Sequence, residues 1–231
     1  MHLVMFDIDG TLTQTDDVDE VCFLQALADV FGFIEVDTDW AGYPHCTDSA
    51  ILEVLFQTHR GRLPTLEDVT TFQSHFIDLL DRAARTQPFR PIHGACELLG
   101  SLASSDTPVS LASGAWECSA RLKLKSAGLH VANLPAAFGD DGHERETIMQ
   151  ASLRRAAAAQ LREAFDSITY VGDGVWDARA SRNLGYRFIG IARDSARDRL
   201  LRAEGAQHVF TDYRDLATFL AVLRESPTPQ G

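Results

Sequence analysis

The sequence contains only two lysines, Lys123 and Lys125, and its 33 Asp and Glu residues outnumber its 21 Lys and Arg residues. The formal net charge at pH 7 is -12. Proteins that bind nucleic acid or an anionic membrane generally present a basic face, so this charge argues against both kinds of partner. An anionic substrate would need local help, from a metal ion or from a few well-placed cations.

Cysteine is also scarce, and long apolar runs are absent. The four cysteines stand far apart and form no C-x-x-C pair, which is typical of small buried side chains in a reducing compartment. No apolar run approaches the length of a membrane span, and the first residues read as a short strand rather than as a signal peptide. We therefore expect a cytoplasmic protein with no membrane partner.

Helical periodicity dominates the first third of the chain after one buried strand, residues 3–8. Apolar residues then recur at spacings of three and four, acids crowd the helix starts, and glycines follow the helix ends. These patterns predict helices over residues 16–31 and 47–61, and from 65 to about 87. Residues 16–87 are thus expected to be all-helical.

Beyond Pro88 and Pro91 the pattern alternates between short apolar strands and amphipathic helices. A long helix is expected within residues 144–165, and a last one at about 213–223. Strands are expected at 109–112, 136–138, 168–171, 187–191 and 208–210. Such alternation is typical of an α/β fold with a doubly wound, mostly parallel sheet. We predict a core domain of residues 1–15 and 88–231, with residues 16–87 inserted as a helical cap domain.

Polar residues gather where the predicted strands end, the edge at which open α/β sheets bind ligands. They are Asp7, Asp9, Ser113, Gly114, Arg145, Asp173 and Asp177. Each alone is most often a turn residue, a helix cap or a solvated charge. Their occurrence together at one edge indicates a functional site.

The chemistry that suits these groups is phosphoryl transfer. Mg²⁺ takes carboxylate oxygens together with water and phosphate, and it would offset the repulsion between Asp7 and Asp9. One carboxylate can attack phosphorus, and a second carboxyl that holds a proton can give it to the leaving oxygen. Ser113 and the Gly114 amide, at a helix start, suit phosphate oxygens. Arg145 would add positive charge to the transferring group.

The segments "DIDGT", "SG" after the second strand, a later basic residue and "GDGVWD" resemble the haloacid dehalogenase-like phosphohydrolases. Their order and spacing cover the chain from Asp7 to about Gly190. The helical insertion resembles the cap of the phosphoglycolate phosphatase-like and β-phosphoglucomutase-like branch, and "GYPHCTD" is similar to a G-x-x-x-x-T-D segment of that cap. The resemblance implies a Rossmann-like core, Mg²⁺ as cofactor and an aspartyl-phosphate intermediate.

Carried over by position, the resemblance implies a role for each acidic residue. Asp7 is the nucleophile and a metal ligand. Asp9 is the general acid and then the base, and its backbone carbonyl also binds the metal. Ser113 holds the phosphate, Asp173 is the second carboxylate ligand, and Asp177 lies in the outer shell of the metal.

The family's third motif is a basic residue, which Arg145 fits by its context; Lys123 and Lys125 are ranked lower. Trp116 and Trp176 lie close to the motifs and are interpreted mainly as packing residues. Substrate recognition falls to residues of the cap and its linkers. The candidates are His45, Thr47, Arg60 and Arg90.

The predicted function is Mg²⁺-dependent hydrolysis of a small phosphorylated metabolite. A phosphosugar mutase shares all the core residues and remains an alternative. So does a non-catalytic binding protein with the same fold, although intact Asp7, Asp9 and Asp173 argue against it. A dehalogenase lacks an acid at the position of Asp9, and a phosphonate hydrolase uses a cap lysine that residues 16–87 do not contain.

Overall fold

The computed structural model describes residues 1–225 and contains one six-stranded sheet in the order β3-β2-β1-β4-β5-β6. All its neighbouring strands run parallel. The strands are β1 (His2–Phe6), β2 (Val109–Ala112), β3 (Ala136–Ala137), β4 (Ser167–Gly172), β5 (Arg187–Ile191) and β6 (His208–Phe210). This topology confirms the predicted doubly wound α/β fold, because the chain turns outward from β1 in both directions.

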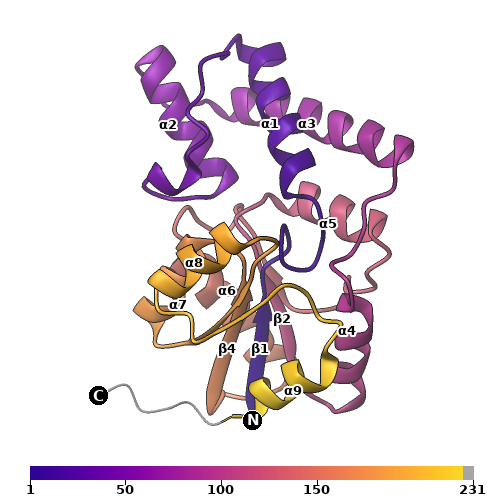
Figure 1. The fold of residues 1–231 in the computed structure, drawn as a ribbon. Helices are drawn as coiled ribbons and strands as arrows, with labels where there is room; N and C mark the ends of the chain where they lie inside the picture. Colours follow the sequence, from indigo (N-terminus) through magenta and orange to yellow (C-terminus); the bar gives the residue numbers. More distant parts are fainter. Residues whose placement is uncertain (226–231) are drawn as a thin grey trace.

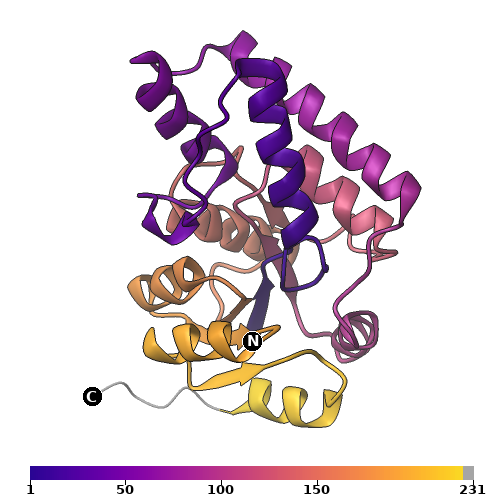
Figure 2. The same ribbon diagram turned by 45° about the horizontal axis from the view of Figure 1, so that its top comes forward.

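Helices cover both faces of the sheet (Figures 1 and 2). In β1, Leu3 and Met5 pack into one core with α6 and α7, and Val4 and Phe6 pack into the other with α4, α5 and α9. β1 is therefore apolar throughout, as expected of a strand covered on both faces. These helices are α4 (Ala95–Ser104), α5 (Glu117–Ser126), α6 (Arg145–Ala159), α7 (Val175–Leu184), α8 (Ser195–Ala203) and α9 (Leu216–Arg224).

A separate helical layer stands over the carboxyl edge of the sheet, opposite the N-terminus (Figure 1). It consists of α1 (Asp16–Phe31), the 3₁₀ helix η1 (Trp40–Gly42), α2 (Asp48–Arg60) and α3 (Leu66–Thr86). Thr47 caps α2, and Thr65 with Asp68 forms a capping box on α3. The layer corresponds to the expected cap, whose domain boundaries stay a prediction. Within residues 1–225, no helix is long and apolar enough to cross a bilayer.

An aromatic cluster joins the helical layer to the sheet layer. The Trp116 ring, at the start of α5, lies with its centroid 6.3 Å from that of Phe23, 5.7 Å from that of Phe72 and 6.4 Å from that of Phe76. All four side chains are buried in the larger of the two cores. This shared core holds the helical layer against the sheet edge and agrees with a packing role for Trp116.

Local contacts set the ends of two helices, of which α6 lies within the expected range of 144–165 and α9 begins later than expected. α6 ends at Ala159, because Leu161 has a positive φ of 51° and the Arg162 N–H closes the helix on the Ala157 carbonyl. Leu161 is 95% exposed, so no apolar face continues the helix there. The last helix begins at Leu216 rather than near 213, since the Asp215 carboxylate caps it.

Candidate active site

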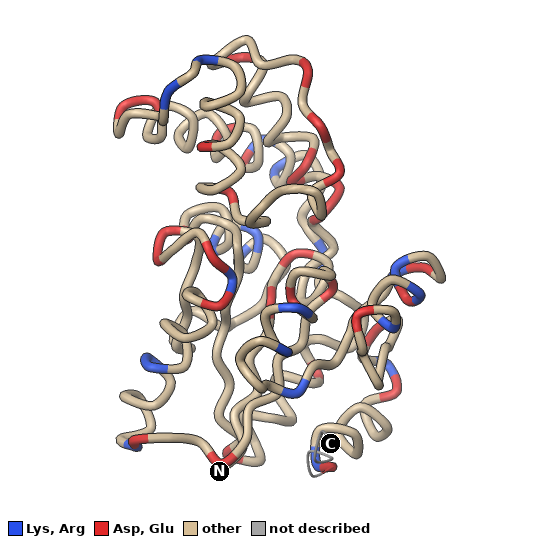
Figure 3. The backbone as a smooth tube through the Cα atoms, turned by 90° about the vertical axis from the view of Figure 1, so that its left-hand side faces the viewer, with Lys and Arg blue, Asp and Glu red and all other residues tan. Residues whose placement is uncertain are grey.

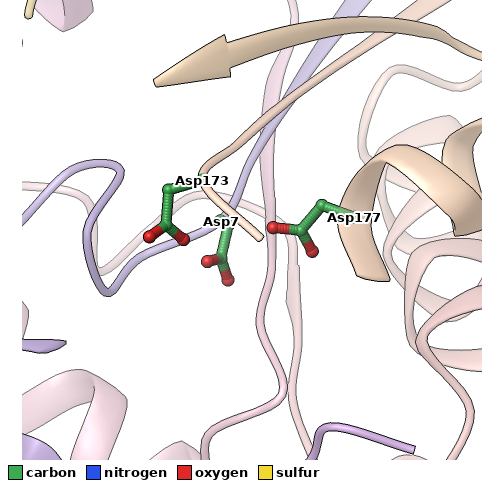
Figure 4. Close-up of side chains that lie close together, drawn as sticks. All are labelled: Asp7, Asp173 and Asp177. Carbon is green, nitrogen blue, oxygen red and sulfur yellow. The ribbon is translucent and has the colours of Figure 1, made fainter. Parts of the chain in front are cut away.

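Three buried carboxylates converge at the carboxyl edge of the sheet (Figure 4). Asp7 follows β1, and its N–H donates to the Val171 carbonyl of β4 at 2.9 Å. Asp173 follows β4, and Asp177 lies in the first turn of α7. One carboxylate oxygen from each of the three lies within 4.8 Å of the others. The parallel register thus brings together residues far apart in sequence.

The turn after β1 separates the two neighbouring aspartates. The Ile8 carbonyl accepts hydrogen bonds from three successive N–H groups, those of Thr11, Leu12 and Thr13. Gly10 has a φ of +68°, and a Cβ there would lie 2.3 Å from Asp173 Oδ2. Only glycine therefore fits this turn. Asp7 remains in the three-carboxylate group, whereas the Asp9 side chain contacts other residues.

Burial makes the ionised state of the three carboxyl groups costly. It raises the pKa of Asp7 to about 7, with a further contribution from Asp177, and it also raises the pKa of Asp173 and Asp177. Oδ1 of Asp7 and Oδ1 of Asp177 are buried without a hydrogen-bond partner among the described residues. Such a set of unpaired, oxygen-only donors fits a hard divalent cation such as Mg²⁺.

Arg145 provides the cation nearest to Asp7. It is the first residue of α6, and its Nη1 lies 3.6 Å from Asp7 Oδ1 while its Nε lies 3.2 Å from Asp177 Oδ1. Burial alone would lower the pKa of Arg145, but Asp177 raises it above its usual value, so the side chain stays cationic. Its Nε and Nη1 have no hydrogen-bond partner in residues 1–225. Arg145 therefore forms ion pairs with Asp7 and Asp177 without hydrogen bonds from Nε or Nη1, and its guanidinium lines the site as a buried cation.

Ser113 and Gly114 lie next to Arg145 at the end of β2. Ser113 is buried, and its Oγ accepts a long hydrogen bond of 3.4 Å from the Ala115 N–H. A Cβ on Gly114 would lie 3.1 Å from Arg145 Nη2 and 2.7 Å from the Cys46 carbonyl. The hydroxyl, the glycine backbone and the guanidinium all line one cavity of about 180 Å³ together with Asp7 and Asp173.

The Asp9 carboxylate is held by a lysine. Its Oδ2 accepts a hydrogen bond from Lys123 Nζ at 2.7 Å, and its Oδ1 accepts one from the Thr15 hydroxyl at 2.5 Å. Lys123 Nζ also donates to Asp19 Oδ1 on α1 at 2.6 Å. Lys123 is fully buried on α5. Of the basic residues considered for the third motif, Arg145 lies at the three-carboxylate group, Lys123 at Asp9, and Lys125 is exposed on the outer face of α5.

We expect Lys123→Met to destabilise the fold, because it leaves Asp9 and Asp19 without their cation. Burial alone would lower the pKa of Lys123, but Asp19 and Asp9 raise it, so the ammonium is charged at neutral pH. Removing one partner of a buried pair costs about 3–5 kcal/mol. We expect a destabilisation at the lower end of this range, since the Asp9 and Asp19 side chains remain 20% and 18% exposed.

Urea denaturation of Lys123→Met and of the matched control Lys125→Met measures this effect. The free energy of unfolding of the control should lie within about 0.5 kcal/mol of that of the unchanged protein, as is usual for surface positions. Equal stability of the two variants would show that the Lys123 ion pairs contribute nothing to the fold.

The cavity between the two layers corrects the expected substrate contacts. Of His45, Thr47, Arg60 and Arg90, Thr47 lines it, and its hydroxyl donates to the His143 carbonyl at 3.0 Å. Arg60 instead lies over the Phe33 ring and donates to the Phe31 carbonyl, so it supports the helical layer. The other two side chains are not part of the lining.

Sequence reasoning missed several residues that line this cavity. Asp48 was read as part of a helix start, yet its carboxylate accepts a hydrogen bond from the Trp116 N–H at 2.9 Å, and burial raises its pKa to about 8. Glu20 and Trp40 also line the cavity. The sequence did contain one signal of a buried charge in this region. Lys123 lies on the apolar stripe of its helix, three residues after Ala120.

Comparison with solved structures supports the fold. A hydrolase from Pseudomonas syringae superimposes with a TM-score of 0.75 at 20% identity, covering 97% of this chain and 100% of the other. A putative β-phosphoglucomutase from Bacteroides vulgatus gives 0.73 at 17% identity, covering 97% and 89%. A predicted phosphoglycolate phosphatase from Haemophilus somnus gives 0.67 at 15% identity, covering 94% and 97%. No curated protein matches the sequence.

The family is established by the sequence itself. The model of the haloacid dehalogenase-like hydrolases matches residues 1–185, most of the chain. That range includes the helical layer, strands β1 to β4 and all the residues of the three-carboxylate group. The chain therefore belongs to the haloacid dehalogenase-like hydrolases.

Proposed function

We propose that the protein is a Mg²⁺-dependent phosphatase that hydrolyses small phosphate monoesters through a phosphoryl group on Asp7. The observation that carries this proposal is the position of Asp7. Its Oδ1 is buried, makes no hydrogen bond to the described residues, and belongs to a residue that lines the cavity beside a cationic Arg145. A carboxylate so placed can act as a nucleophile toward a bound phosphate.

Phosphate binding falls to three groups in this proposal. The Arg145 guanidinium and the Ser113 hydroxyl hold the phosphate oxygens, and the Gly114 backbone lies beside them. When bound by the carboxylates of Asp7 and Asp173 and the Asp9 carbonyl, Mg²⁺ supplies positive charge that offsets the crowded acids and polarises the phosphate. Asp177 holds Arg145 in place through the contact at 3.2 Å.

The reaction then proceeds in two steps. Ionised Asp7 attacks phosphorus, a bond forms between its oxygen and phosphorus, and the ester P–O bond breaks. For this step Asp9 takes up a proton from solvent on Oδ2 in place of the hydrogen bond from Lys123. It then gives that proton to the leaving oxygen, which departs as an alcohol. In the second step Asp9 accepts a proton from water, the water oxygen attacks phosphorus, and Asp7 is released together with inorganic phosphate.

The charges in the cavity favour hydrolysis over phosphosugar mutation. A mutase must hold a second phosphate while the first is transferred. The arginines that line the cavity already face acids: Arg193 contacts Asp16 and Asp17, and Arg197 contacts Asp173. Arg145 is committed to the transferring phosphate. No lining cation of the described chain is left for a second phosphate.

Metal removal tests the cofactor. We expect chelation to abolish hydrolysis of an aryl phosphate, and Mg²⁺ to restore it, because three crowded carboxylates share only two neighbouring cations, Arg145 and Arg197. Mg²⁺ should also raise the melting temperature of the chelated protein by binding the folded state. Asp173→Asn should lose most of this shift. Full hydrolysis by a metal-free sample would contradict the proposal.

A further inference from the structure

The part of the cavity formed by the helical layer is acidic and aromatic. Its lining residues are Asp16, Asp17, Asp19, Glu20, Phe23, Trp40, Cys46, Thr47, Asp48 and Ile51. Within the described chain, this layer contributes no Lys, Arg or His to the lining. In the proposed phosphatase reaction the layer faces the group esterified to the phosphate. Acidic and aromatic side chains therefore select that group. Figure 3 shows acidic positions in both layers, including the level at which they meet.

The cavity does not stabilise an anionic leaving group. A carboxylate or a second phosphate on the substrate needs a cation, and those nearby are engaged. Lys123 is bound to Asp9 and Asp19 at 2.7 and 2.6 Å, and Arg193 to Asp16 and Asp17 at 2.9 and 2.7 Å. A buried anion without a partner is costly, so the cavity discriminates against it.

Hydrogen-bond donors on this side are also engaged. Trp40 Nε1 donates to Glu20 Oε2 at 2.5 Å, and the Thr47 hydroxyl donates to the His143 carbonyl. The Trp116 N–H donates to Asp48. The acids Asp16, Asp17 and Asp19 are likewise paired, with Arg193 and Lys123. What the wall offers a ligand is therefore the Glu20 carboxylate, which has no cation partner within residues 1–225, and ring faces. A neutral polyol needs donors as well as acceptors, whereas an ammonium group needs acceptors only, and it also binds to aromatic faces.

We propose that the substrate is a small phosphate monoester whose leaving group carries a cationic amine. The ammonium lies against Glu20 and Trp40, while the phosphate lies at Arg145 and Ser113. This inference rests on the proposed phosphatase function and names its substrate class. The cavity of about 180 Å³ is partly open to solvent, and the part of the leaving group that it holds is a short chain.

Three esters of matched size test the charge preference: 2-aminoethyl phosphate, 2-hydroxyethyl phosphate and carboxymethyl phosphate. In the presence of Mg²⁺, we expect kcat/KM to fall by roughly tenfold at each step from cation to neutral to anion, the effect of about one partly buried ion pair. An equal or higher kcat/KM for the hydroxyl or the carboxylate ester would overturn the inference.

A matched pair of variants locates the preference. Glu20→Gln keeps the oxygen that accepts from Trp40 but removes the charge, so the ratio of kcat/KM for the amine ester over the hydroxyl ester should fall severalfold. Glu35→Gln makes the same change at an exposed position of the helical layer and should leave the ratio unchanged. If the two variants give the same ratio, Glu20 does not read the ammonium group.

Binding separates this inference from the proposed chemistry. Calorimetry with Asp7→Asn and Mg²⁺ should give tighter binding of 2-aminoethyl phosphate than of carboxymethyl phosphate, without turnover. If the unchanged protein hydrolyses no ester, including an aryl phosphate, while this order of binding holds, the phosphatase proposal fails and the charge preference stands. If an aryl phosphate is hydrolysed but the order of binding is reversed, the charge preference fails and the phosphatase proposal stands.

Discussion

Asp7→Asn is expected to abolish turnover of every phosphate ester, with kcat lower by on the order of 10⁵-fold or more, as when a covalent nucleophile is removed. The amide matches the carboxyl group in shape but does not attack phosphorus. The substitution does not change the cavity or the phosphate-binding residues Arg145 and Ser113, so ester binding should persist. Steady-state hydrolysis of an aryl phosphate measures the loss. Residual activity above about 1% would assign the nucleophile elsewhere.

The same variant has a second expected result, which shows that its inactivity is not caused by misfolding. Burial raises the pKa of Asp7 to about 7, well above the usual range of an aspartate. A group whose pKa is raised by folding takes up protons in the folded state, so the metal-free protein loses stability as pH rises from about 4 to 7. Asp7→Asn removes this loss. Its melting temperature without metal should therefore exceed that of the unchanged protein at pH 8, and the difference should shrink toward pH 4.

Asp9→Asn is expected to slow hydrolysis by about 10²–10⁴-fold for an alkyl phosphate, the usual loss on removing a general acid. An aryl phosphate leaves without full protonation, so its penalty should be smaller. The variant keeps the nucleophile Asp7 and the backbone carbonyl of residue 9. The asparagine side chain keeps one oxygen that accepts from either Lys123 or Thr15, the partners of Asp9 in the structure, while its NH2 group takes the place of the other oxygen.

Single-turnover phosphorylation with an alkyl and an aryl ester separates these effects. Thr15→Val is the matched control, because it removes one hydrogen bond to Asp9 but leaves the carboxyl group in place. It should slow both esters by similar, modest factors. Equal impairment of Asp9→Asn on both esters would contradict its role as proton donor.

The positions of Asp7 and Asp173 could be predicted from sequence because parallel strands end at one edge. Each strand was recognisable as a short apolar run, so the residue that follows it has a defined place. The Mg²⁺ ligand set and the catalytic roles stay predictions. The structure adds that one carboxylate oxygen from each of Asp7, Asp173 and Asp177 lies within 4.8 Å of the others. A sequence pattern does not contain this geometry.

Contacts between the layers could not be predicted. Lys123 and Asp19 are 104 residues apart and meet only because the helical layer docks on the sheet layer, where α3 packs against α5. The same holds for the Asp48 carboxylate on the Trp116 amide, 68 residues away. Such contacts depend on how two layers dock, which hydrophobic periodicity does not encode. Of the substrate candidates in the helical layer, Thr47 lines the cavity and His45 and Arg60 do not.

Trapping the phosphorylated protein tests the central claim most directly. The protein with Mg²⁺ and an alkyl phosphate is quenched in acid within the first turnover, and its peptides are analysed by mass spectrometry. We predict a phosphoryl group on the peptide that contains Asp7, formed before phosphate is released and absent from Asp7→Asn. Release of phosphate with no phosphorylated peptide at any time, or with the phosphoryl group on another residue, would contradict the account.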